Sequence, residues 1–197
     1  MASARVIPLC VPFWDERAAL EAGALYSQEQ GFHVLALQEQ VRPWLPAKWA
    51  RPGAALMPDM LPVTTWEVNA RALFGGLPWE RMRKHCYKAA GFRCEICGIR
   101  GPLEAHERFE LENETAVQRL TGLLCLCPLC HKGHHLGFAR RTGMAAAVLE
   151  HMREVNGWGV RALQAALAEA EDAFEQRKDW PWTVDLSWLR SSGYLYV

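Results

Sequence analysis

The chain has 197 residues, of which half are hydrophobic and 22% are charged, a composition typical of globular proteins. Lysine and arginine together number 22, as do aspartate and glutamate, which excludes a protein that binds its partners through net charge alone. The charge is unevenly distributed, because residues 81–141 carry 11 basic and 6 acidic side chains. A basic patch in this region would suit a phosphate ligand, and an uneven solvated surface is the alternative.

The sequence does not predict contact with a membrane. It contains no run of 18 or more apolar residues, which a transmembrane helix would need. The opening residues, MASARVIPLCVPFWDE, place acidic side chains after only a short apolar stretch, unlike a secretory signal. We therefore expect a cytoplasmic protein whose seven cysteines stay reduced.

Residues 1–50 are predicted to form a small αβ unit. The stretch RVIPLCVPF is rich in β-forming residues and bounded by prolines, so it predicts a strand, and GFHVLAL predicts a second one. Between them, DERAALEAGALY predicts a short helix that Asp15 would cap. Residues 51–65 are rich in proline and predict a linker.

A helix is predicted early in the central domain, which we place at residues 66–140. Trp79, Met82 and Cys86 recur at intervals of three and four residues, the spacing of one helix face. Gly91 would end this helix, because glycine readily takes the left-handed conformation that follows a helix.

Residues 141–197 are predicted to form a helical extension. The apolar pattern indicates helices over residues 138–156 and 159–178, which an Asn-Gly pair separates. After Pro181 the tail alternates between apolar and polar residues, which predicts a short strand.

Two C-x-x-C pairs form the strongest motif in the chain. Cys94 and Cys97 make up the first pair, Cys127 and Cys130 the second, and 29 residues lie between the pairs. Two such pairs can present four thiolates to one tetrahedral zinc ion. The sequence therefore predicts a structural zinc site at these four residues. The remaining cysteines are expected in the core: Cys10, Cys86 and Cys125.

Three histidines near the second pair suggest another metal site. His131 and His135 are four residues apart, so a helix that begins near Cys130 would place both on one face. The stretch LEAHERFE predicts a strand on which His106 points away from Ala105 and could join them around a second ion. His134 lies between these helix faces and is expected to contact solvent or phosphate. Alternatively, the histidines only support or decorate a structural zinc module.

These motifs, CEIC…LEAHE…GLLCLCPLCHKGHHLG, resemble the zinc-knuckle form of the HNH, or His-Me finger, endonucleases over residues 80–140. The resemblance implies an α+β fold, with a ββα-metal core of two strands and a helix around Mg²⁺ or Mn²⁺. By position, His106, His131 and His135 would bind this ion, and Glu107 would be the general base. A register shifted by one residue would instead make His106 the base.

The same resemblance implies that a water molecule attacks a DNA phosphodiester. Basic side chains would hold the phosphates: Arg81, Arg83, Lys84, Lys88, Lys132 and His134. One reading without catalysis stays open because glutamate occupies the base position and the asparagine typical of the family has no match. The chain would then be a degenerate zinc module that binds DNA or a protein partner. The helical tail and the Trp-rich ends favour a third reading, a structural subunit of a larger assembly or a homo-oligomer.

The N-terminal unit resembles a second family. The stretch VPFWDERAALEAGALYSQEQGFHV, followed by WLP, is similar to a small domain of unknown function that accompanies bacterial DNA-processing proteins. The usual Gly-Ala-Arg-Trp-Asp of that domain is replaced by Gly-Ala-Leu-Tyr-Ser at residues 23–27. The resemblance agrees with an association with DNA.

Overall fold

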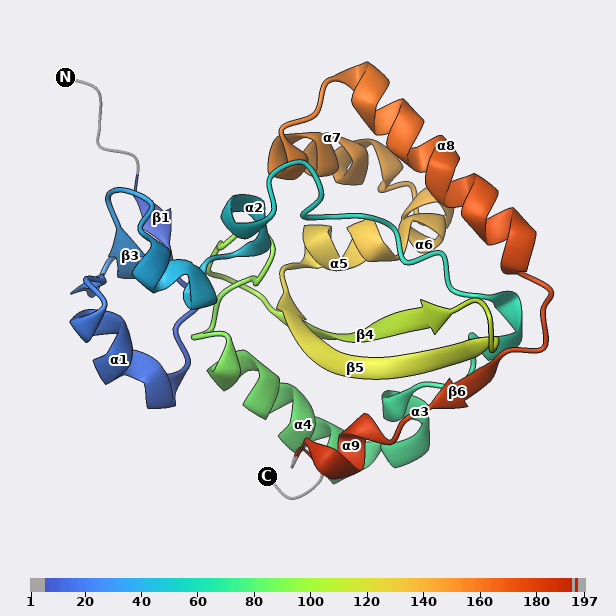
Figure 1. Cartoon of the computed structure of the whole chain (residues 1–197), viewed down its shortest axis with the longest axis horizontal. Coiled ribbons are helices and arrows are strands. Elements are labelled where there is room, and N and C mark those ends of the chain that lie inside the picture. The colour runs from blue at the N-terminus through green and yellow to red at the C-terminus, as the bar shows by residue number, and fades with distance from the viewer. Residues whose placement is uncertain (1–5, 193, 195–197) are drawn as a thin grey trace.

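The computed structural model describes residues 6–192 and residue 194. They form a mixed α+β structure with two separate three-stranded sheets (Figure 1), so the α+β class predicted from the sequence is confirmed. The smaller sheet lies in the N-terminal unit, and helices surround the sheet with the longer strands. Among the described residues, no helix is long and apolar enough to cross a membrane.

The N-terminal sheet is antiparallel, in the order β1-β3-β2, and shares an apolar core with one short helix. That helix ends at Glu21, earlier than the sequence predicts, because Gly23 has a φ of 92° and turns the chain into a strand. The elements of this unit are β1 (Ile7–Pro8), α1 (Glu16–Glu21), β2 (Leu25–Ser27), β3 (Gly31–Val34) and α2 (Ala47–Ala50), with 3-10 turns at Phe13–Asp15 and Glu39–Trp44.

The second sheet is built on a long antiparallel hairpin of β4 (Glu104–Glu112) and β5 (Val117–Leu126). The strand predicted in the tail is present as β6 (Thr183–Asp185), which pairs in parallel with the start of β5. The helices outside the N-terminal unit are α3 (Ala70–Phe74), α4 (Gly76–Ala89), α5 (Pro128–His134), α6 (Leu136–Arg141), α7 (Ala145–Asn156), α8 (Val160–Arg177) and α9 (Trp188–Ser191), with a 3-10 turn at Val63–Thr65.

The hairpin separates two apolar cores. Successive residues of a strand point to opposite faces of the sheet. Leu124 and Leu126 belong to the core that contains α5 and α7, whereas Leu123 and Cys125 belong to the core that contains α4 and α9. His106 pairs with Leu124 and lies on the face toward α5, as the alternation in LEAHERFE predicts. The hairpin thereby brings a strand histidine to the helix that follows it.

The C-terminal helices differ from the predicted pair at one point. Residues 138–156 hold parts of two helices, α6 and α7, because Gly143 has a φ of 73° and interrupts the helix. The predicted break after α7 is confirmed at Gly157, whose φ is 69°. On α8, Leu163 is buried but Val160 is 55% exposed, so this helix covers α7 with only part of its apolar face.

An extended segment, residues 51–62, leads from α2 past α5 toward α3 (Figure 1). Leu56 lies so close to Gly133 of α5 that a Cβ at Gly133 would be 2.9 Å from its side chain. At the end of α7, the Asn156 amide accepts hydrogen bonds from the backbone N–H groups of Ala55 and Leu56, at 2.8 and 3.0 Å. It also donates one to the carbonyl of Leu56 at 2.8 Å. The predicted linker is therefore fixed against α5 and α7.

Replacing Asn156 with alanine is expected to lower the free energy of unfolding by about 3 kcal/mol. The change removes three hydrogen bonds of a buried amide and leaves backbone groups without partners, each of which costs roughly 1–3 kcal/mol. Urea denaturation followed by circular dichroism measures the loss. Asn113→Ala, in the exposed turn between β4 and β5, is the control and should change stability by less than about 0.5 kcal/mol. Equal effects of the two substitutions would contradict this account.

Candidate metal centres

The four cysteines of the two C-x-x-C pairs converge as predicted. Their sulfurs lie within 4.8 Å of one another, and those of Cys97 and Cys127 are 3.7 Å apart. Sulfurs that share a tetrahedral zinc are about 3.8 Å apart, since each Zn–S bond is about 2.3 Å. None of the seven cysteines, all of which lie within the described residues, forms a disulfide. The four residues thus form a site that can hold a metal such as zinc.

The first pair lies in a turn that the N-terminal unit supports. The carbonyl of Cys94 accepts a hydrogen bond from the N–H of Gly98 at 2.8 Å. Gly98 has a φ of 75°, and a Cβ there would lie 2.5 Å from Pro8, so glycine is required on both counts. From the start of α2, backbone N–H groups donate to the carbonyls of Glu95 and Ile96 at 2.7 and 2.9 Å. The turn that carries Cys94 and Cys97 and the N-terminal unit therefore stabilise each other.

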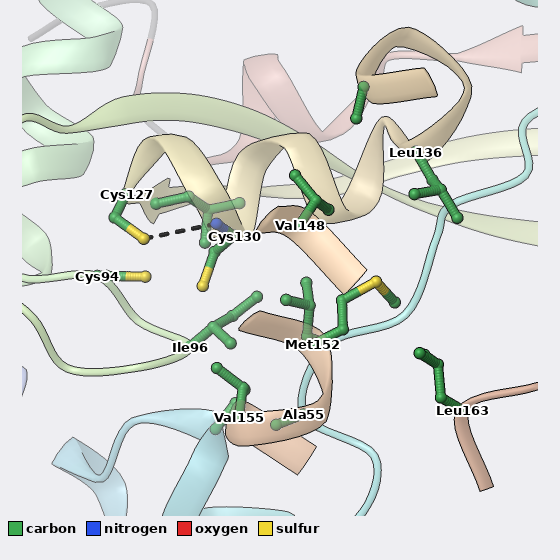
Figure 2. Close-up of a cluster of buried hydrophobic side chains, with 14 residues drawn as sticks. Ala55, Cys94, Ile96, Cys127, Cys130, Leu136, Val148, Met152, Val155 and Leu163 are labelled. Atoms are coloured by element: carbon green, nitrogen blue, oxygen red, sulfur yellow. Dashed lines mark hydrogen bonds between the residues drawn. The ribbon is translucent and has the colours of Figure 1, made fainter. Parts of the chain in front are cut away.

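The second pair lies at the N-terminus of α5. Figure 2 shows Cys94, Cys127 and Cys130 gathered where this helix meets the buried core. The sulfur of Cys127 accepts a hydrogen bond from the N–H of Cys130 at 3.5 Å, and Pro128 occupies the first helical turn. Hydrogen bonds from the other three thiols lower the pKa of Cys127. His151 of α7, which the motif does not reveal, places Nε2 3.1 Å from the sulfur of Cys130 and can donate to its thiolate.

Three histidines also converge, from β4 and from α5 and its C-terminal end. The ring centroids of His106, His131 and His135 are 4.8–5.1 Å apart, and the rings lie at 69–75° to one another. Imidazole nitrogens bound at about 2.1 Å to one ion would place the ring centroids roughly 4.6–5.3 Å apart. One nitrogen from each ring lies within 4.8 Å of the others. The three side chains, hereafter the histidine triad, therefore fit a single divalent ion.

The surroundings of the histidine triad favour its metal-binding form. Burial lowers the pKa of His106. Burial also lowers the pKa of His135 to about 4, helped by the nearby charges of His106 and His131. Both shifts favour the neutral ring, which is the form that binds a metal ion. The Nδ1 atom of His131 contacts the Glu104 carboxylate, which orients the ring and leaves its other nitrogen free. Glu104 is a supporting residue that the sequence motif did not identify.

A carboxylate from the extended segment also joins the histidines. An Asp59 oxygen, Oδ1, accepts a hydrogen bond from Nδ1 of His134 at 2.7 Å, while Oδ2 lies 2.9 Å from Nε2 of His106. Burial alone would raise the pKa of Asp59, but the contacts with His106 and His134 outweigh burial and hold it well below its usual value. His134 was expected at solvent or phosphate. It is instead turned toward Asp59, with only 13% of its side chain exposed.

Glu107 lies apart from the histidine triad. It follows His106 on β4, so its side chain points to the opposite face of the sheet, where its carboxylate accepts a hydrogen bond from the N–H of Ala70 at the start of α3. Burial raises the pKa of Glu107, and this backbone hydrogen bond only partly offsets the rise. The structure thus places Glu107 where it supports α3, and not where the family resemblance puts a general base.

A groove of about 640 Å³ lies beside the histidine triad, between α4 and α5. Of the basic residues predicted to bind nucleic acid, Arg83 and Lys132 line this groove. Arg81, Lys84 and Lys88 are exposed on α4 and do not line it. The predicted phosphate-binding residues are therefore divided between the groove and the outer surface of α4.

Comparisons of the chain with protein-family models, with curated proteins and with solved structures give no match.

Proposed function

We propose that the chain is a metal-dependent DNA nuclease of the HNH type, with β4, β5 and α5 as its ββα-metal core. The observation that carries the proposal is the convergence of His106, His131 and His135 on one point. A strand histidine and two helix histidines one turn apart are the ligands that the motif implies. The cysteine site begins the same helix, so a zinc ion there would hold α5 against the hairpin.

The ligand chemistry indicates which ions to test. Three neutral imidazoles suit Zn²⁺, Ni²⁺, Co²⁺ or Fe²⁺ better than Mg²⁺, which prefers oxygen ligands. A divalent ion held by the histidine triad would act as a Lewis acid and stabilise the negative charge that develops on the phosphate oxygens. The histidine triad alone would therefore bind the Mg²⁺ or Mn²⁺ expected from the family resemblance less tightly than Zn²⁺, Ni²⁺, Co²⁺ or Fe²⁺.

The groove supports nucleic acid as the substrate. Arg71 and Lys132 line it without an ion pair among the described residues, so both are available to phosphates. Trp79 and Phe138 line the same groove and offer aromatic faces on which a base can stack. The groove reaches His131 and His135, so a strand bound there would bring a phosphate to the histidine triad.

The groove also offers a replacement for Glu107 as the proton acceptor. Two acidic residues line it, Glu80 and Glu104. Glu80 is paired with Arg83 at 2.6 Å, and this ion pair lowers its pKa. Glu104 contacts His131 through Oε2 and is partly exposed. We therefore propose Glu104 as the carboxylate that receives the proton of the attacking water.

A nicking assay tests this function. Supercoiled plasmid is incubated with the zinc-loaded full chain in separate reactions with Mg²⁺, Mn²⁺, Co²⁺ and Ni²⁺. We expect nicked circles with at least one ion, and a loss of at least about 100-fold in rate for His135→Ala, because a metal ligand is gone. His85→Ala is the matched control, since His85 lies on α4 and not among the clustered histidines, and it should retain the wild-type rate. Wild-type protein that leaves the plasmid intact with all four ions would refute the proposal.

One observation favours a second candidate function, a zinc module without catalysis that binds DNA or a protein. The general base that the motif implies is turned away, because Glu107 contacts α3. Under this alternative the groove and the basic face of α4 would still bind DNA. Binding would then survive His135→Ala, and no cleavage would accompany it.

A further inference from the structure

We infer that Asp59, His106 and His134 form a second position for a divalent cation, adjoining the histidine triad and sharing His106 with it. One donor atom from each of these residues lies within 4.8 Å of the other two. The triad uses His106 with two further imidazoles, whereas this second position combines two imidazoles with a carboxylate. The inference goes beyond the proposed nuclease centre, because Asp59 comes from the extended segment and not from the hairpin or α5.

The contact between Asp59 and His106 resembles that of two ligands of one ion. Oδ2 and Nε2 are 2.9 Å apart, an ion-pair contact, and neither atom has a partner that meets hydrogen-bond geometry within the described part of the chain. Two ligands bound at about 2.1 Å and at right angles would be roughly 3.0 Å apart, with their lone pairs directed at the ion and not at each other. The observed distance fits that arrangement.

The absence of other partners for these atoms supports a cation. Asp59 Oδ2, His106 Nε2 and His134 Nε2 are all buried and have no hydrogen bond within the described part of the chain. His106 is only 4% exposed. A buried polar atom without a partner costs roughly 1–3 kcal/mol, so three of them in one place need an explanation. A bound divalent ion would satisfy donors from all three residues.

The extended segment is held firmly enough to serve as a ligand support. The N–H of Asp59 donates to the carbonyl of His134 at 3.1 Å. Upstream, Leu56 packs on Gly133, and Asn156 binds the backbone of residues 55 and 56. Asp59 is therefore fixed to the helix that carries His134. A ligand held in this way loses little conformational freedom when an ion binds.

The two positions should select different ions. A neutral imidazole offers one lone pair, so His106 can serve only one of them at a time. The position with Asp59 contains a carboxylate, which suits Mn²⁺, whereas the histidine triad suits Ni²⁺. We therefore expect Mn²⁺ to bind mainly with Asp59 and Ni²⁺ mainly with His135.

Metal affinities of two variants test this inference. The full chain carrying one equivalent of zinc is titrated with Mn²⁺, followed by the free-ion electron paramagnetic resonance signal, and separately with Ni²⁺, followed by calorimetry. Asp59→Ala should weaken Mn²⁺ binding at least about tenfold and change Ni²⁺ binding by less than about threefold. His135→Ala should instead weaken Ni²⁺ binding at least about tenfold and change Mn²⁺ binding by less than about threefold. Asp59→Asn, which keeps the size of the side chain but removes its charge, should also weaken Mn²⁺ binding. Circular dichroism melting confirms that each variant is folded.

Other patterns overturn the inference. If Asp59→Ala weakens the binding of both ions equally, Asp59 only supports a single site. If it leaves the affinity for Mn²⁺ within about threefold of wild type, Asp59 is not a ligand. The titrations do not depend on cleavage. A wild-type chain that binds Mn²⁺ through Asp59 but cuts no DNA would support this inference and refute the nuclease proposal. A chain that cuts DNA but does not bind Mn²⁺ through Asp59 would refute this inference and support the nuclease proposal.

Discussion

Cys130→Ser is expected to unfold the central part of the chain and to abolish zinc binding. Cys130 is fully buried in the core that also contains Cys94 and Cys127. Structural zinc in small domains contributes roughly 10–16 kcal/mol of apparent binding free energy. A domain of this size has a total stability of only about 5–15 kcal/mol. Loss of the ion therefore removes as much free energy as the fold has.

The measurement is zinc content by elemental analysis, together with a thermal melt followed by circular dichroism. We expect at least one zinc per wild-type chain, and neither bound zinc nor a cooperative transition for Cys130→Ser. Cys86→Ala is the matched control, because Cys86 is equally buried but lies on α4, outside the cysteine site. It should keep its zinc and lose about 1 kcal/mol. A Cys130→Ser protein that binds zinc and melts like the wild type would contradict the four-cysteine site.

His106→Ala is expected to abolish metal-dependent cleavage, whereas the adjacent change Glu107→Gln should leave it nearly intact. His106 is the one residue common to the histidine triad and to the position that contains Asp59, so its removal weakens both. We expect a rate loss of at least about 100-fold. In Glu107→Gln, the side-chain carbonyl still accepts the hydrogen bond from Ala70, so α3 keeps its support. The expected rate is within about threefold of wild type.

These two neighbours distinguish the alternatives that the motif leaves open. The plasmid assay for nicking and the calorimetric Ni²⁺ titration are run on both variants. If His106 is a metal ligand, its alanine variant loses Ni²⁺ affinity together with cleavage. If the register were shifted and His106 were only the base, cleavage would fall while Ni²⁺ affinity stayed the same. A large loss of cleavage in Glu107→Gln would restore Glu107 as the base and contradict its placement against α3.

Much of both candidate metal sites could be predicted from local spacing. The two C-x-x-C pairs identify their four residues, since a short turn fixes both sulfurs of a pair. Helical spacing places His131 and His135 together, and strand alternation sets His106 apart from Ala105. These patterns depend on residues at most five positions apart, which is why the sequence reveals them.

The supporting residues could not be predicted, because tertiary packing alone brings them to the metal centres. Asp59 lies in a proline-rich stretch with no periodicity, 47 residues before His106. Asn156 and His151 belong to α7, where they look like ordinary helix residues until that helix packs on α5. For Glu107, by contrast, the motif suggested a role that its position in the structure does not fit. Its place in the motif suggests a base, but the pleat of β4 directs it to the other face.

The contact of Gly98 with Pro8, described above, affects where the chain can be divided. Pro8 precedes the turn that carries Cys94 and Cys97 by almost ninety residues, yet it occupies the space that a side chain at position 98 would fill. A fragment that begins after residue 50 would expose the apolar surface of this turn to water and would lose both hydrogen bonds from α2. The boundary drawn from the sequence after residue 50 thus cuts through contacts between the N-terminal unit and this turn. Residues before the linker therefore help to hold the turn that presents two of the four clustered cysteines.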